Sequence, residues 1–254
     1  MPYATDPAAP RDSYSVPELT MAWGRGWAVS RGTSAPVGVP GGFRVDVGLP
    51  GHRVRHVLHT HDADVLGRLG RKLTAPGNWI KACGDPDEFR SALPDGWTMD
   101  TAGYLMTVRF REGAARPQPG YAVRVDTDPD SGVVVATVLD RAGEKAASGR
   151  LAPAGEFGIV DKVETEPNHR RRGLGTVVMR TLADRAAADG MRTGILVATD
   201  DGRALYRSLG WTVRSDVAGA FRPGGGKWSA GGTGMYRDQR ASGITSRHDA
   251  TTER

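Results

Sequence analysis

The stretch Val163-Glu-Thr-Glu-Pro-Asn-His-Arg-Arg-Arg-Gly-Leu-Gly-Thr176 joins a predicted strand to a predicted helix through a tight glycine turn. Residues 157–163, which lead into it, are mostly apolar and have the pattern of an extended segment. Behind the turn, apolar residues recur with helical period over residues 174–186, until Gly190 ends the pattern. The turn is therefore expected at a helix N-terminus, where unpaired N–H groups and the helix dipole favour a bound anion.

The residues of the turn favour a phosphate as that anion. Gly173 and Gly175 carry no Cβ that would hold a phosphate away from the amides, and residues 170–172 are arginines that can donate to phosphate oxygens. A dinucleotide site is not indicated, because Gly-x-Gly-x-x-Gly is absent and no acidic residue closes a following strand. A nucleotide P-loop is excluded, since no Gly-Lys-Ser/Thr follows the turn.

The spacing Arg170-x-x-Gly173-x-Gly175 after a strand resembles the pyrophosphate loop of the GNAT superfamily of acyl-CoA-dependent N-acyltransferases. Residues 163–167 resemble the strand before that loop, residues 194–198 the following strand, and residues 204–211 the late helix that carries a tyrosine, all in the family's order. The resemblance implies an α/β fold (a mixed α+β sheet) that is twisted and flanked by helices. It also implies acetyl-CoA as co-substrate and no metal.

The composition indicates a soluble globular chain. Its 254 residues are 39% hydrophobic, which is enough for a core, and no run approaches the roughly 18 apolar residues of a membrane span. Residues 1–12 lack the apolar core of a signal peptide, and the single cysteine, Cys83, cannot form an internal disulfide, so a cytoplasmic location is expected. The net charge of +5 is mild and favours anionic ligands without arguing for nucleic acid.

An internal repeat divides the chain into two halves. Residues 79–99 parallel residues 195–213: Phe89-Arg-Ser matches Tyr206-Arg-Ser, and Gly-Trp-Thr follows in both. We therefore predict two GNAT-like halves in tandem, each a twisted mixed sheet flanked by helices. The first half has residues 59–61 in place of the glycine turn and phenylalanine in place of the tyrosine, so it is predicted to be degenerate and structural.

The predicted organisation has four parts. They are a disordered start at residues 1–12, the degenerate half at residues 13–103, the acetyl-CoA-binding half at residues 104–236, and a disordered tail at residues 237–254. In the first half, residues 16–31 are expected to form a short helix broken near Gly24 or Gly26, and residues 42–48 and 53–59 to form a hairpin-like pair.

Strands of the second half are predicted at residues 104–110, 121–126, 132–139, 218–221 and 227–236. Only residues 127–131 separate two of these strands, which is the length of a turn, so the helices that the family normally has after its first strand are missing. In the family those helices help to wall the acceptor pocket. Residues 16–31 would have to supply that wall here.

Acetyl transfer needs the amine as the free base, which for a pKa of about 10.4 costs roughly 4 to 5 kcal/mol at pH 7. Glu164 and Glu166 alternate onto one face of the strand beside the expected thioester, and either could take the proton directly or through a water. His169 is a third candidate, and a solvated or arginine-paired side chain is the alternative for each. The family binds the thioester carbonyl at a main-chain N–H where this strand splays, which implies Val163 to Thr165 here.

Tyr206 matches the tyrosine that in many family members protonates or hydrogen-bonds the departing thiolate. A phenol with a pKa near 10 is a weaker acid than a thiol near 8.5, so a hydrogen bond is the better supported role, and packing on its helix is the alternative. Thr199 stands where many members have an asparagine that contacts cofactor or backbone. The predicted cofactor-binding residues are Val163, Glu164, Thr165, Arg170, Arg171, Arg172, Gly173, Leu174, Gly175, Thr176, Thr199 and Tyr206.

The predicted function is an N-acetyltransferase that transfers an acetyl group from acetyl-CoA to a primary amine of a small molecule, an antibiotic-like compound or a metabolite. The alternatives are a protein lysine or N-terminal acetyltransferase and a non-catalytic acyl-CoA sensor. A nucleic-acid-binding module is disfavoured, because the basic residues 169–172 belong to the phosphate turn. The predicted partner is the amine alone, with no nucleic acid and no membrane, and the chain is expected to be a monomer or a homodimer.

Overall fold

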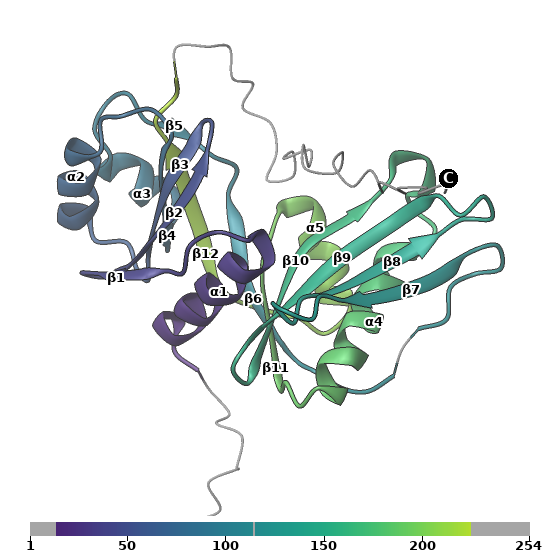
Figure 1. Ribbon diagram of the computed structural model, residues 1–254. Helices are drawn as coiled ribbons and strands as arrows, with labels where there is room; N and C mark the ends of the chain where they lie inside the picture. The colour runs from purple at the N-terminus through teal and green to yellow at the C-terminus, as the bar shows by residue number, and fades with distance from the viewer. Residues whose placement is uncertain (1–13, 114, 225–254) are drawn as a thin grey trace, which may run out of the picture.

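The computed structural model describes residues 14–113 and 115–224. Its strands form one twisted sheet in the order β1-β2-β3-β4-β12-β6-β11-β10-β9-β8-β7, with β5 attached to β12 (Figure 1). The strands are β1 (Val37–Val39), β2 (Gly42–Leu49), β3 (His52–Leu58), β4 (Asn78–Cys83), β5 (Thr98–Met99), β6 (Gly103–Arg109), β7 (Ala122–Thr127), β8 (Val134–Leu139), β9 (Lys145–Ala154), β10 (Phe157–Thr165), β11 (Thr193–Ala198) and β12 (Thr212–Phe221). The helices are α1 (Val16–Arg31), α2 (Ala63–Lys72), α3 (Pro86–Ala92), α4 (Leu174–Ala188) and α5 (Asp200–Ser208), with a short 3-10 turn at Pro167–His169.

Two similar units flank the centre of this sheet. In the first, β3 and β4 run parallel and α2 connects them; in the second, β10 and β11 run parallel and α4 connects them. The last strand of each unit pairs with a strand of the other unit. The last strand of the first unit, β6, is hydrogen-bonded to β11 of the second, and the last strand of the second unit, β12, is hydrogen-bonded to β4 of the first. Strands β6 and β12 also pair with each other. The predicted α/β fold with two similar halves in tandem is confirmed, and a strand exchange joins the halves. The predicted boundary between residues 103 and 104 stays a prediction; it would place β6 in the second half, whereas the exchange described here counts β6 with the first unit.

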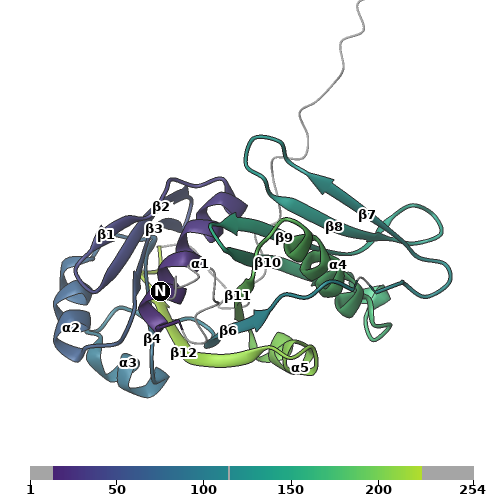
Figure 2. The ribbon, with the colours of Figure 1, turned by 90° about the horizontal axis from the view of Figure 1, so that it is seen from below.

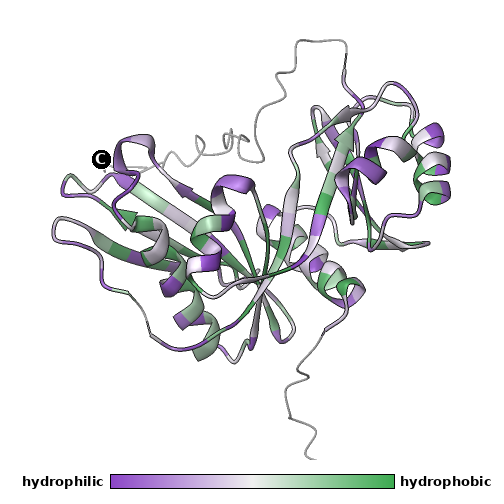
Figure 3. Ribbon diagram, turned by 180° about the vertical axis from the view of Figure 1, so that it is seen from behind, coloured by the Kyte–Doolittle hydropathy of each residue, from purple (hydrophilic) through white to green (hydrophobic). Residues whose placement is uncertain are grey.

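The helices divide unequally between the two faces of the sheet. Side chains of α4 pack with Val160 and Leu196 on one face, and α2 and α3 pack on the same face against Ile80 and Ala218. Among the helices of residues 14–113 and 115–224, α1 is the one that covers the other face, where it contacts strands of both halves. Figure 2 shows α1 inside the curve of the sheet, and Figure 3 shows the other helices from behind. A single helix therefore bridges the two halves.

Helix α1 is continuous, so the break predicted near Gly24 or Gly26 is wrong. Both glycines allow α1 to lie close against the sheet. A Cβ on Gly24 would lie 2.3 Å from Cζ of Phe43, and a Cβ on Gly26 would lie 2.2 Å from Cγ1 of Ile159. Glycine lowers helix propensity by only about 1 kcal/mol, and burial of Trp23 and the rest of this face against the sheet outweighs that cost.

Other predictions divide between those that the structure confirms and those that fall outside its range. The hairpin is confirmed as β2 and β3, which pair antiparallel, and residues 218–221 form the end of β12. The predictions for residues 1–12, 227–236 and 237–254 lie outside the described residues. No helix in the described ranges is long and apolar enough to cross a membrane.

Candidate functional site

Strands β10 and β11 separate halfway along their length. They pair only from Phe157 to Ile159 on β10, although β10 continues to Thr165 and β11 continues for three residues past Ile195. The cause lies in β10, whose register with β9 shifts between Asp161 and Glu164 and whose Lys162 has a φ of +50°. A wedge-shaped gap therefore opens beside the segment Val163 to Thr165, where the sequence analysis expected a splayed strand.

The glycine turn, residues 170–176, follows the wide end of this gap. Gly173 is the N-cap of α4 with a φ of +71°, and no side chain caps the helix there. A Cβ on Gly173 would meet no atom within 4 Å, so the space in front of the helix N-terminus is open on that side. Arg171 also has a positive φ of +61°. A helix N-terminus without a side-chain cap and with open space beside it has the features of an anion site.

Gly175 has a second role that the motif did not indicate. A Cβ at this position would lie 3.0 Å from Cδ2 of Leu205 on α5, so the glycine allows α4 and α5 to approach closely. Leu174 is buried in the core below the turn, whereas Thr176 is half-buried. The spacing of the motif therefore serves packing of the two helices as well as access to the backbone.

The arginines and His169 shape the turn through contacts with its neighbours. Nε of Arg170 donates to the carbonyl of Thr165 at 3.4 Å, and Nη1 of Arg172 donates to the hydroxyl of Tyr121 at 2.8 Å. Nδ1 of His169 lies 3.0 Å from that hydroxyl, and its Nε2 lies 3.7 Å from Asp140. The imidazole, the third candidate base, is thus held beside the loop between β8 and β9 and the start of β7.

The two glutamates differ in their surroundings. Glu164 is exposed near the end of β10, whereas Glu166 is half-buried and its carboxylate lies 3.1 Å from Nζ of Lys145. The carboxylate nearest the narrow end of the gap is Asp161, which the sequence analysis missed. The signal that could have indicated it is an acidic residue inside the otherwise apolar run at residues 157–163.

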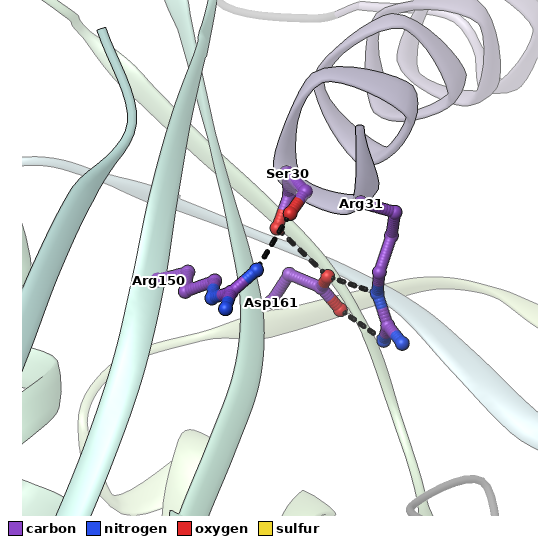
Figure 4. A network of polar contacts seen from close by, with 4 residues as sticks. All are labelled: Ser30, Arg31, Arg150 and Asp161. Carbon is purple, nitrogen blue, oxygen red and sulfur yellow. Dashed lines mark hydrogen bonds and ion pairs between the residues drawn. The ribbon is translucent and has the colours of Figure 1, made fainter. Parts of the chain in front are cut away.

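Asp161 anchors the C-terminal end of α1 (Figure 4). Its carboxylate accepts from Nε and Nη2 of Arg31 at 2.6 and 2.8 Å and from the hydroxyl of Ser30 at 2.9 Å, while Arg150 donates to the carbonyl of Ser30 at 2.9 Å. Burial alone would raise the pKa of Asp161, but the hydrogen bonds and charge of Arg31 hold that pKa below its usual value. Asp161 is therefore ionised and fully engaged near neutral pH.

Tyr206 and Thr199 lie on and before α5, on the face opposite α1. The ring of Tyr206 is half-buried beside Trp211, with 6.1 Å between ring centroids, and its hydroxyl makes no hydrogen bond within residues 14–113 and 115–224. Burial, and then the charge of Asp161, raise the pKa of Tyr206 to about 12. Asp161 and Tyr206 thus flank the gap from opposite faces of the sheet. Thr199 caps α5, because its Oγ1 accepts from the N–H of Gly202 at 3.2 Å.

The corresponding position in the first half is closed. Strands β3 and β4 stay paired over five residues, from Val54 opposite Asn78 to Leu58 opposite Ala82. Phe89 is fully buried, and Nε2 of His61 lies 2.7 Å from the carboxylate of Glu88 across the loop that replaces the glycine turn. The second half therefore has the gap, the turn and the tyrosine together, and the first half has none of them.

No group of three or more histidine, cysteine, aspartate or glutamate side chains in the described ranges could hold a metal ion.

Comparisons with known proteins agree with this geometry. Residues 87–211 match the model of the acetyltransferase (GNAT) family. A GCN5-related N-acetyltransferase from Kribbella flavida has a similar structure, with a TM-score of 0.61 and 17% identity over 84% of this chain and 98% of that one. A putative acetyltransferase of the GNAT family from Novosphingobium aromaticivorans has a TM-score of 0.52 and 18% identity, over 82% of this chain and 99% of that one. A GCN5-related N-acetyltransferase from Sphaerobacter thermophilus has a TM-score of 0.52 and 13% identity, over 72% of this chain and 78% of that one. At such identities the solved structures show a shared fold, and the family match shows that residues 87–211 form an acetyltransferase domain of the GNAT family.

Proposed function

We propose that this enzyme transfers an acetyl group from acetyl-CoA to a primary amine of a small molecule by direct attack of the amine. The observation that carries the proposal is that the gap between β10 and β11 leads to the open glycine turn at the start of α4. A phosphate at Gly173 and an extended arm in the gap would bring a thioester between Tyr206 and Asp161. Acetyl-CoA supplies the activated acyl group, and the protein binds and orients it.

Each protein group has a defined role in this proposal. The main chain of Val163 to Thr165 polarises the thioester carbonyl through its N–H groups. The C–N bond forms as the C–S bond breaks, and the Tyr206 hydroxyl donates a hydrogen bond to the sulfur. A pKa of about 12 makes this phenol a donor that keeps its proton, so the released thiolate takes its proton from solvent.

The proton of the amine goes to Glu164 or Glu166, directly or through a water. Glu164 is the more exposed of the two, and the carboxylate of Glu166 forms an ion pair with Lys145. We assign Asp161 an anchoring role and not proton abstraction, because three hydrogen bonds from Ser30 and Arg31 already occupy its carboxylate. A monomer or homodimer in the cytoplasm, with no nucleic-acid partner, completes the proposal.

The test is release of free thiol from acetyl-CoA in the presence of a panel of small primary amines, lysine peptides and peptides with free N-termini. The expected result is thiol release that depends on at least one small amine and disappears in Gly173→Val. Turnover of peptides alone would favour the protein acetyltransferase. Binding of acetyl-CoA without thiol release for any acceptor would favour the sensor.

A further inference from the structure

Tyr121 connects the glycine turn to β7, the last strand of the sheet. Its hydroxyl accepts a hydrogen bond from Nη1 of Arg172 at 2.8 Å and lies 3.0 Å from Nδ1 of His169. Its half-buried ring packs against the core of the second half and meets the ring of His169 edge to face, with 5.8 Å between the ring centroids. The packing of the ring therefore fixes the position of the hydroxyl.

The donors and acceptors of this network follow from their chemistry. Arginine only donates hydrogen bonds, so the Tyr121 oxygen accepts from Arg172, and the phenolic proton remains for Nδ1 of a neutral His169. The proton of that imidazole is then on Nε2, which faces Oδ2 of Asp140 at 3.7 Å. Oδ1 of Asp140 accepts from two N–H groups of its own turn, at 2.9 and 3.0 Å, so the carboxylate is fixed as well. The network thus ties the glycine turn to the β8–β9 turn.

Tyr121 is what restrains the side chain of Arg172. Arg172 is exposed, and within residues 14–113 and 115–224 the Tyr121 hydroxyl is its one hydrogen-bond partner and no carboxylate forms an ion pair with it. One N–H group of the guanidinium is used in this contact, and the others remain able to donate. Arg172 directly precedes Gly173, the N-cap of α4, so the residue that Tyr121 holds is the one next to the open helix N-terminus.

We propose that Tyr121 is a positioning residue for the cofactor, which holds Arg172 so that its guanidinium donates to the pyrophosphate of acetyl-CoA. This inference rests on the proposed function. An unrestrained arginine loses rotamer freedom when it binds an anion, and a hydrogen bond that already restrains the side chain reduces this loss. The planar guanidinium also suits the task, because its fork of N–H groups can donate to two phosphate oxygens at once.

The experiment measures the Kd of three ligands by titration calorimetry, which needs no acceptor amine. Acetyl-CoA and acetyl-dephospho-CoA both carry the pyrophosphate, whereas S-acetylpantetheine lacks it. Tyr121→Phe keeps the ring and should raise the Kd of both pyrophosphate ligands by about 5- to 20-fold. The Kd of S-acetylpantetheine should stay the same, and kcat at saturating acetyl-CoA should stay near that of the wild type. Equal weakening of all three ligands would indicate general damage to the site and would overturn the inference.

A double-mutant cycle tests whether Tyr121 acts through Arg172. Arg172→Met should weaken binding of acetyl-CoA at least as much as Tyr121→Phe does, and the double variant should bind no more weakly than Arg172→Met. Losses that add in the double variant would show that the two residues act independently, which contradicts the inference.

Tyr14→Phe is the matched control, because the ring of Tyr14 lies 4.8 Å from that of Phe157 at the start of β10 and takes no part in the network. Removal of its hydroxyl should leave each Kd unchanged. An unchanged Kd of acetyl-CoA in Tyr121→Phe would overturn the inference while the proposed function stands. Failure of the wild type to bind acetyl-CoA would refute both.

Discussion

Tyr206→Phe removes one hydroxyl from a ring whose packing beside Trp211 stays the same. The hydroxyl makes no hydrogen bond within the described part of the chain, so its loss leaves no partner unsatisfied. The effect of the substitution on catalysis can therefore be measured apart from its effect on stability, although the two usually occur together. We expect a change of less than about 0.5 kcal/mol in the free energy of unfolding, as for substitutions that break no contact.

The expected effect on catalysis is much larger. If the hydroxyl donates to the sulfur only as the thiolate forms, its removal lowers kcat by about 10² to 10³, or roughly 2.7 to 4 kcal/mol of transition-state stabilisation. The Kd of acetyl-CoA should barely change, because the substitution keeps the ring and its packing beside Trp211 and removes the hydroxyl alone. A pKa of about 12 also predicts that kcat does not titrate with this phenol between pH 6 and 9.

The assay measures kcat by thiol release, Kd of acetyl-CoA by calorimetry and Tm by thermal unfolding, on wild type, Tyr206→Phe and Tyr14→Phe. Tyr14 is the control because its hydroxyl interacts with Glu156 at the far end of β10. Its loss should lower the free energy of unfolding by about 0.5 to 1.5 kcal/mol and spare kcat. Wild-type turnover in Tyr206→Phe would refute the assigned role of the hydroxyl.

Three further outcomes are expected. Gly173→Val should weaken acetyl-CoA binding in calorimetry by at least about 100-fold while the chain stays folded, since the left-handed φ costs only about 1 to 2 kcal/mol; an unchanged Kd would contradict the phosphate turn. The same titration on wild type should give one acetyl-CoA per chain, because β3 and β4 leave no gap, and a value of two would show that the first half binds as well. Asp161→Asn removes the charge from a partly buried pair with Arg31 and should cost about 1.5 to 3 kcal/mol at pH 7. The pKa of Asp161 in the folded chain lies below its ordinary value of 3.8, so the ion pair stabilises the chain above about pH 4. This stabilisation is lost as the pH falls through the folded pKa. The difference in Tm between wild type and variant should therefore shrink in acid.

Local patterns were enough to predict the parts of the site that are close together in sequence. The glycine turn, the strand before it and the helix after it follow from spacing within residues 157–186, and the repeat identified the two halves. Asp161 was missed because its significance depends on Arg31, which lies far away in the sequence and meets it only through the packing of α1. The same packing explains the wrong break in α1, since Gly24 and Gly26 look like helix breakers until the sheet is placed against them.

The strand exchange could not be read from periodicity either. The sequence predicts a strand at residues 218–221 but does not say which strands lie beside it. Pairing of β12 between β4 and β6 joins residues more than 100 positions apart. Such contacts depend on the fold as a whole, because any strand of suitable length could satisfy the same local preferences.

The exchange also sets an order of events during synthesis. When β4 and β6 leave the ribosome, the edge of each strand that will pair with β12 is open, because β12 ends only at Phe221. A nascent chain therefore carries these two open edges through translation of more than 100 further residues, at about 5 to 20 residues per second. Open strand edges invite pairing with other chains, so the unfinished protein is a natural client for a chaperone, and a truncation before residue 212 leaves a sheet that cannot close.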